Sequence, residues 1–190
     1  MHRAKEPDWI KDLEFGELGE KFAAFTMGWT RSPKKVKEYD LRNSVGKTIE
    51  LKSDGYTTVP LEGYKLTKNM FIEEISNEEL NTLGGPRRAV RDNVDFFAYL
   101  FWPNKKIYIF KSSALLFAVD FSIAGREMKR IENKRKDEEG NVTSTYTTKG
   151  YAIPIKELEG AAENVIEFGA DIVEEFLALK ENQPERLENL

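Results

Sequence analysis

The feature that most limits how this chain can fold is an alternation of apolar and charged side chains in residues 47–54. Ile49 and Leu51 alternate with Glu50 and Lys52 in a segment rich in strand-forming residues. Because successive side chains of a β-strand point to opposite faces of the sheet, we expect one apolar face for a core. The opposite face would then carry a carboxylate and an ammonium group.

An acidic residue two positions before a lysine also occurs at Glu127-Met-Lys129 and Glu132-Asn-Lys134. Both of these copies lie in the charged stretch 126–139, which shows no strict apolar alternation. Only the copy at Glu50 therefore has the pattern of a strand.

Asp40 lies ten positions before Glu50, in a region that predicts a β-hairpin. We expect a strand over Val36–Leu41, a turn at Asn43–Gly46 and an antiparallel partner strand over Lys47–Asp54. Asp40 and Glu50 are equidistant from Val45, so a hairpin centred there makes them cross-strand neighbours. Two carboxylates so placed repel each other unless a cation or a proton intervenes.

Chain length and composition narrow the possible architectures and chemistries. With 190 residues and no linker-like segment, we expect a single domain over residues 1–190. Its core would comprise about 11–120 and 149–180, and a basic arm would span 122–148. The chain has no cysteine, and its only histidine is His2. Disulfides, Cys-based metal sites and histidine-based triads are therefore not expected.

Charge and hydropathy bear on partners and location. The apolar runs are too short to span a bilayer, and residues 1–10 lack the apolar region of a signal peptide. We therefore expect no membrane partner and a cytoplasmic protein. The net charge is -4, but residues 157–190 hold ten acidic and two basic residues, a net of -8, which leaves +4 for residues 1–156. Since screening confines charge effects to roughly 10 Å, an acidic chain can still bind DNA.

The remaining elements follow from periodicity and from turn residues. Amphipathic helices are predicted over 11–27 and 158–179, and short helices over 84–93 and 112–120. Strands are predicted over 69–76, 95–102, 106–110 and 150–155, and a hairpin or mobile arm over 126–148.

The order helix, strand, strand, strand, helix, strand resembles the PD-(D/E)XK nuclease superfamily, in particular its small phage-type members and Holliday-junction resolvases. The likeness runs from about Gly16 to Phe110 and rests on three short motifs: Gly19-Glu-Lys-Phe-Ala23, Tyr39-Asp-Leu41 and Ile49-Glu-Leu-Lys52. Asn69-Met-Phe-Ile-Glu73 and Asp95-Phe-Phe-Ala-Tyr99 resemble the core segments that follow in such nucleases. Tyr39 stands where the family has proline. The resemblance implies an α/β fold with a restriction-endonuclease-like core. This core has a mixed central sheet flanked by helices (αβββαβ), to which a basic hairpin insertion and a C-terminal amphipathic helix are added. If a phage encodes the chain, its expected location is the host cytoplasm.

The resemblance also implies roles for individual residues. Asp40, Glu50 and the backbone carbonyl of Leu51 would bind Mg²⁺ or Mn²⁺, whose preferred ligands are hard oxygens. Lys52 would position or deprotonate the attacking water. Glu20 would complete the site through water or a second ion, with Glu17 as its rival.

Two further acidic residues have two interpretations each. Asp54 is either an outer ligand of the site or a turn residue before Gly55, and Glu73 is either an outer ligand or a solvated strand residue. An ordinary surface salt bridge, worth about 0 to 1 kcal/mol, remains the alternative for the whole group around Asp40, Glu50 and Lys52.

Three basic clusters could receive a phosphate backbone. The clusters are Arg31, Lys34, Lys35 and Lys37; Arg87, Arg88 and Arg91; and Arg126, Lys129, Arg130, Lys134, Arg135 and Lys136.

We therefore expect a Mg²⁺-dependent DNA endonuclease, acting on branched or otherwise structured DNA. The alternatives are a non-catalytic DNA-binding or assembly protein that retains a nuclease fold, and an exonuclease or restriction-type enzyme. The acidic C-terminal helix would either pack on its own core or form a homodimer.

Overall fold

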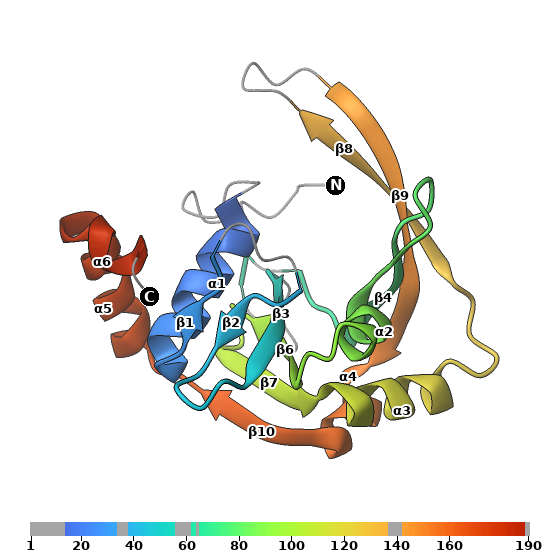
Figure 1. Ribbon diagram of the computed structural model, residues 1–190, viewed down its shortest axis with the longest axis horizontal. Coiled ribbons are helices and arrows are strands. Elements are labelled where there is room, and N and C mark those ends of the chain that lie inside the picture. The colour runs from blue at the N-terminus through green and yellow to red at the C-terminus, as the bar shows by residue number, and fades with distance from the viewer. Residues whose placement is uncertain (1–13, 34–37, 56–61, 64, 137–141, 189–190) are drawn as a thin grey trace.

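The computed structural model describes residues 14–33, 38–55, 62–63, 65–136 and 142–188 (Figure 1). The helices are α1 (Glu14–Met27), α2 (Gly85–Arg91), α3 (Ser112–Ser122), α4 (Ile155–Leu158), α5 (Ala170–Asn182) and α6 (Pro184–Glu188), with a 3-10 turn, η1 (Glu159–Ala161). The strands are β1 (Thr30–Arg31), β2 (Leu41–Arg42), β3 (Thr48–Asp54), β4 (Asn69–Asn77), β5 (Thr82–Leu83), β6 (Phe96–Phe101), β7 (Lys106–Lys111), β8 (Lys129–Lys136), β9 (Val142–Pro154) and β10 (Ala162–Glu167).

A six-stranded mixed sheet forms the centre of the fold, in the order β1-β2-β3-β6-β7-β10. The β3–β6 pair is parallel and the other pairs are antiparallel. The expected α/β class, with a mixed sheet flanked by helices, is thereby confirmed.

The third strand of the expected αβββαβ order lies outside this sheet. Because β2 and β6 already occupy both sides of β3, β4 pairs with β9 in a second, antiparallel sheet of order β5-β4-β9-β8. Gly150 of β9 permits β9 to lie close to β4, since a Cβ at Gly150 would lie 2.3 Å from the carbonyl oxygen of Ile72 in β4.

Strand β6 contributes to two hydrophobic cores through its alternating side chains. Ala98 and Leu100 lie in the first core, with α1, β3 and α5, whereas Phe97, Tyr99 and Phe101 lie in the second, with β4, α2 and α3. The first core includes Leu18, Phe22, Ile49, Leu51, Ile107, Phe168 and Phe176. The second includes Met70, Ile72, Phe110, Leu115, Val119, Ile153 and Leu158.

The predicted hairpin centred at Val45 is present. Leu41 pairs with Ile49 and Arg42 with Thr48, so the register is symmetric about Val45. Gly46 supplies the positive φ of +85° in the turn. The first strand is much shorter than predicted: β2 covers only Leu41–Arg42, while residues 34–37 lie outside the described part of the chain.

The predicted helix over 158–179 is wrong in its first half. After α4 and η1 the chain forms β10, which covers the edge of β7, and only then α5. Adjacent β-branched residues Val165 and Ile166 favour this strand. Gly169 is the N-cap residue of α5. A side chain at this position would collide with Asp171, since a Cβ would lie 2.0 Å from Asp171 Oδ1.

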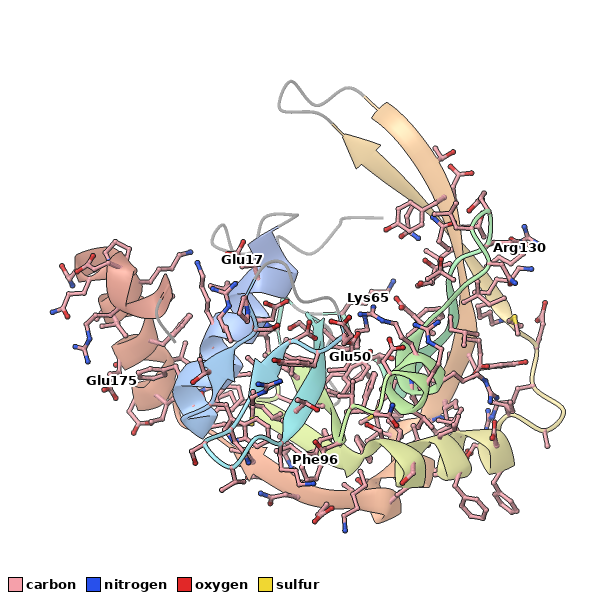
Figure 2. The ribbon with its side chains drawn as sticks, in the orientation of Figure 1. Glu17, Glu50, Lys65, Phe96, Arg130 and Glu175 are labelled. Carbon is pink, nitrogen blue, oxygen red and sulfur yellow. The ribbon has the colours of Figure 1, made fainter. Side chains whose placement is uncertain are left out.

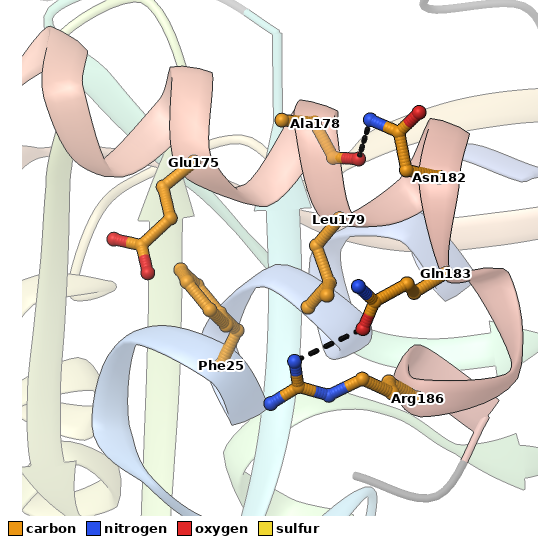
Figure 3. A pocket seen from close by; sticks show the side chains of 7 residues that line it. All are labelled: Phe25, Glu175, Ala178, Leu179, Asn182, Gln183 and Arg186. Carbon is orange, nitrogen blue, oxygen red and sulfur yellow. Dashed lines mark hydrogen bonds between the residues drawn. The ribbon is translucent and has the colours of Figure 1, made fainter.

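Helix α5 packs on its own core, which accounts for its apolar stripe. Phe176 is 1% exposed, and its ring centroid lies 5.2 Å from that of Phe22 on α1. A hollow of about 260 Å³ remains between α1 and the α5–α6 segment, lined by Phe25, Leu179 and Arg186 among others (Figure 3). Within the described ranges, no helix has the length and apolar character needed to cross a bilayer.

The basic arm is continuous with the second sheet. Strand β9 runs without interruption from Val142 to Pro154, so the arm strand and the predicted strand over 150–155 are one strand. It pairs with β8 over the outer part of its length and with β4 over the inner part. The outer part of this hairpin projects beyond the rest of the molecule (Figure 1).

Candidate active site

Strand β3 separates an apolar face from a charged one, as its alternation predicts. Ile49 and Leu51 are 0% and 7% exposed in the first core. On the opposite face, Glu50 is only 4% exposed and lies between α1 and α2 (Figure 2). Lys52 Nζ lies 3.5 Å from Glu50 Oε1 and 3.7 Å from Glu73 Oε2. Lys52 is therefore held between two carboxylates, one on each sheet.

Asp40 reaches the same place from the end of β2. Its backbone N–H donates to the Ile49 carbonyl at 2.8 Å, and its Oδ2 accepts the Leu51 N–H at 2.6 Å. Because β2 begins at Leu41, the Asp40 carboxylate satisfies a β3 amide that a longer β2 would pair. The N–H and C=O of one strand residue point to the same side, so the Leu51 carbonyl faces the Asp40 edge and not β6.

Helix α1 brings Glu20 to this group through a close contact with β3. A Cβ on Gly19 would lie 1.8 Å from Ser53 Oγ, so glycine allows α1 to approach the strand. Glu20 lies near enough to Asp40 and Glu50 for their charges to interact. Glu17 pairs instead with Lys21 at 3.5 Å and with Arg31 Nη2 at 3.3 Å.

Burial and mutual repulsion make ionisation of these carboxyls unfavourable. Burial raises the pKa of Asp40 and of Glu50, and so does the neighbouring negative charge, that of Glu20 for Asp40 and that of Asp40 for Glu50. The pKa of Glu20 is also raised, by burial first and despite the nearby Arg31. A cation bound among these groups would relieve the repulsion.

Lys52 responds in the opposite sense to the same surroundings. Burial lowers the pKa of Lys52, but the negative charges of Glu73, Glu50 and Asp40 outweigh it, so this pKa lies above its ordinary value. Lys52 is thus a cation at neutral pH in the absence of metal.

Arg88 on α2 is a site residue that sequence reasoning assigned only to DNA binding. Its Nη2 lies 3.7 Å from Glu50 Oε2, and its Nε lies 3.6 Å from Asp92. Helix α2 reaches this position because Gly85, with φ +45°, packs where a Cβ would lie 2.4 Å from the Glu73 carbonyl oxygen. In the sequence, only the Gly84-Gly85-Pro86 motif at the start of α2 could have indicated that this helix packs closely on a strand and so brings Arg88 to the site.

Asp54 and Tyr99 form a fixed polar pair beside Lys52. The Tyr99 hydroxyl donates to Asp54 Oδ2 at 2.9 Å and accepts the Phe71 N–H at 3.3 Å. Burial and the charge of Asp54 raise the pKa of Tyr99 well above its usual value, so the hydroxyl stays protonated.

The predicted DNA-binding residues are dispersed, and several are ion-paired. Arg31 lies beside the carboxylates, with Nη2 3.6 Å from Glu20 Oε2. The other pairs are Arg87 with Glu74 and Asp120, Arg91 with Asp92, Arg126 with Glu157, Lys129 with Glu127, and Arg130 with Glu78. Lys34, Lys35 and Lys37 lie outside the described residues; Lys134, Arg135 and Lys136 lie in β8, but their side chains are not described.

The metal donors predicted from the resemblance are oxygen atoms of β3 and of the residue just before β2. Among the residues that the structure describes, no group of three or more His, Cys, Asp and Glu side chains is arranged to hold a metal ion. The predicted direct donors, however, are two carboxylates and a backbone carbonyl. Asp40 and Leu51 share one edge of β3, and Glu50 is adjacent to Leu51 in the chain. Oxygen donors of this kind suit Mg²⁺, so the residues fit the ion by their chemistry.

The sequence matches no known protein-family model and no curated protein sequence. Buried carboxylates that repel one another, next to two cations, can bind a divalent metal and receive a negatively charged phosphate.

Proposed function

We propose that the protein is a Mg²⁺- or Mn²⁺-dependent endonuclease that hydrolyses phosphodiester bonds in branched or otherwise structured DNA. The observation that carries this proposal is that Asp40, at the edge of β3, lies near Glu50 and Lys52 on the charged face of that strand, with mutual repulsion between the two carboxylates. The spacing of Asp40, Glu50 and Lys52 in the sequence resembles that of the PD-(D/E)XK nucleases, which also supports a nuclease function.

In this proposal each residue has a distinct task. Asp40, Glu50 and the Leu51 carbonyl would hold the ion, and Glu20 would act through water. The ion would polarise the phosphate and lower the pKa of a bound water. Lys52, a cation by its raised pKa, would orient that water and offset the charge that develops on the phosphate. Arg88 and Arg31 would contact the adjacent phosphates.

A test of this function compares plasmid and four-way-junction cleavage in Mg²⁺, in Mn²⁺ and in EDTA. We expect Glu50→Ala and Lys52→Ala each to lower the cleavage rate by about 10²–10³-fold. Lys111→Ala is the matched control, because Lys111 ends β7 with its side chain 62% exposed and paired with Glu163. Undiminished cleavage by both site variants would exclude this site.

A second candidate function is DNA binding without cleavage. It is favoured by the ion pairs of Glu50 with Lys52 and Arg88, which already neutralise this carboxylate without a metal. This protein would bind DNA in a salt-dependent way, show no metal-dependent cleavage, and give no Mg²⁺ or Mn²⁺ binding in calorimetry.

A homodimer also remains a prediction, because two-strand cleavage of a junction needs two sites. Light scattering would then give twice the chain mass of 21.9 kDa.

A further inference from the structure

A cavity of about 280 Å³ opens beside Lys52, between the two sheets. Strand β3 contributes Lys52 and Asp54, β4 contributes Phe71 and Glu73, β6 contributes Tyr99, and the arm strand β8 contributes Ile131. The cavity therefore joins the candidate active site to the arm, although these segments are far apart in the sequence.

The apolar part of the lining is largely aromatic. Phe71, Phe97 and Tyr99 all line the cavity, and Ile131, 41% exposed, borders it from β8. Phe97 and Tyr99 are only 1% and 4% exposed, so the half-buried Phe71 is the aromatic residue that can contact an occupant. An aromatic residue at such a place favours a flat ring that can stack on it, worth about 1–3 kcal/mol per nucleic-acid base.

The polar part of the lining combines two carboxylates with Lys52 and Ser53, so it presents hydrogen-bond acceptors beside a cation. Asp54 and Glu73 are carboxylates, and Asp54 is oriented by the Tyr99 hydroxyl at 2.9 Å. Tyr99 is itself fixed by the Phe71 amide. Acceptors of this kind complement a ring whose edge carries amino or N–H donors, as adenine, cytosine and guanine do.

The size of the cavity limits its occupant. At about 280 Å³ it lies just below the usual range of small-molecule sites, roughly 300–1,000 Å³. That volume suits one ring system and is too small for a stacked base pair. Because Lys52 lines both the cavity and the candidate active site, a strand with its phosphate at Lys52 can place an adjoining base in the cavity.

We propose that this cavity binds one unpaired base of the DNA strand being cut, turned out of the stack and placed against Phe71. The inference rests on the proposed nuclease function and specifies its substrate class: DNA with an unpaired nucleotide next to the scissile phosphate. Extruding a base costs least where it is already unpaired, so the cavity selects bulges, flaps and junction points over continuous duplex.

The test uses three DNA duplexes that differ at one central position: fully paired, bulged by one 2-aminopurine, and bulged by one abasic nucleotide. Binding is measured in EDTA by anisotropy, and insertion of the base by 2-aminopurine fluorescence. We expect the 2-aminopurine bulge to bind about 5–100-fold more tightly than the other two duplexes, in line with the free energy of stacking one base.

Variants of the cavity wall connect this preference to the structure. Phe71→Ala and Ile131→Ala should bring the affinity ratio towards one, and Phe71→Tyr should preserve it. Ile131 lies on the arm and is partly exposed, so its substitution tests the cavity even if Phe71→Ala fails to fold. Phe117→Ala is the matched control, because Phe117 is 77% exposed on α3 and should leave the ratio unchanged.

The outcomes separate this inference from the nuclease proposal. Equal binding of all three duplexes, together with Mg²⁺-dependent cleavage, overturns the cavity assignment alone. A clear preference for the 2-aminopurine bulge without cleavage in Mg²⁺ supports the cavity and overturns the nuclease function. Absence of both binding and cleavage overturns both.

Discussion

Glu50 is a buried carboxylate whose ionisation the fold makes more difficult. Burial and the charge of Asp40 raise its pKa, despite the ion pairs with Lys52 and Arg88. A carboxyl whose pKa is raised by folding binds its proton more tightly in the folded state. Its contribution to stability is therefore fully present below the unfolded pKa, and is lost as the pH rises through the folded pKa.

This sign predicts that Glu50→Gln stabilises the metal-free protein at pH 8. We expect its Tm to exceed that of the wild type by a few degrees, since about 1 kcal/mol shifts Tm by roughly 2–4 °C in a domain of this size. The difference should shrink as the pH falls through the raised pKa of Glu50. Thermal melts in EDTA across this pH range provide the measurement.

Thermal melts of the wild type and of Glu50→Gln also measure whether Glu50 is needed to bind Mg²⁺. Mg²⁺ should raise the Tm of the wild type and leave that of Glu50→Gln unchanged. Glu175→Gln is the control, because this exposed glutamate on α5 should leave the response to Mg²⁺ as in the wild type. If Glu50→Gln melts below the wild type at every pH, the ion pairs of Glu50 outweigh the repulsion.

At the scale of single elements, α2 depends on one glycine for its position over β4. Gly85 combines a positive φ of +45° with a close approach to the Glu73 carbonyl oxygen. Gly28, after α1, has a similar φ of +65° but no atom within 4 Å of an added Cβ. Both glycines therefore adopt a positive φ that other residues rarely adopt, but only Gly85 lacks the space for a side chain.

We predict that Gly85→Ala destabilises the protein more than Gly28→Ala. Gly28→Ala should cost about 1–2 kcal/mol from backbone strain. Gly85→Ala should cost about 1–3 kcal/mol more, since the backbone must move to admit the methyl group. Urea denaturation of both variants measures the difference, and equal losses would show that α2 tolerates a shift away from Glu73.

The elements that sequence alone predicted well were those with a clear local period. The alternation at Ile49 and Leu51 predicted β3 and its buried face, and the symmetric spacing about Val45 predicted the hairpin register. Non-local contacts decided the rest: β10 forms because the edge of β7 needs a partner, and no local pattern assigns β4 to a second sheet. Arg88 was missed as a site residue for the same reason, since only the packing of α2 on β4 brings it to Glu50.

At the scale of the whole molecule, β6 joins the two hydrophobic cores into one cooperative unit. Phe22 belongs to the first core and Leu115 to the second, and both are 0% exposed. Since alternate residues of β6 enter each core, neither core can lose its packing without exposing one face of this strand.

We therefore predict that Phe22→Ala and Leu115→Ala lower the same unfolding transition. The expected losses are about 3–5 kcal/mol for Phe22→Ala and about 2–5 kcal/mol for Leu115→Ala. Differential scanning calorimetry should give a single peak for the wild type and for both variants. A second peak in either variant would show that the two cores unfold separately.

The hydrogen bond from the Leu51 amide to Asp40 Oδ2 affects which residues should be conserved among homologues of this protein. Because this carboxylate completes the edge of β3, selection for the fold alone would favour keeping it, whether or not the protein cleaves DNA. Lys52 forms ion pairs with the Glu50 and Glu73 side chains, so its replacement would leave the main-chain pairing of β3 intact. If the proposed nuclease function holds, a homologue that retains the aspartate but has lost the lysine would therefore keep the fold without cleavage, and homologues that cleave DNA would retain both residues.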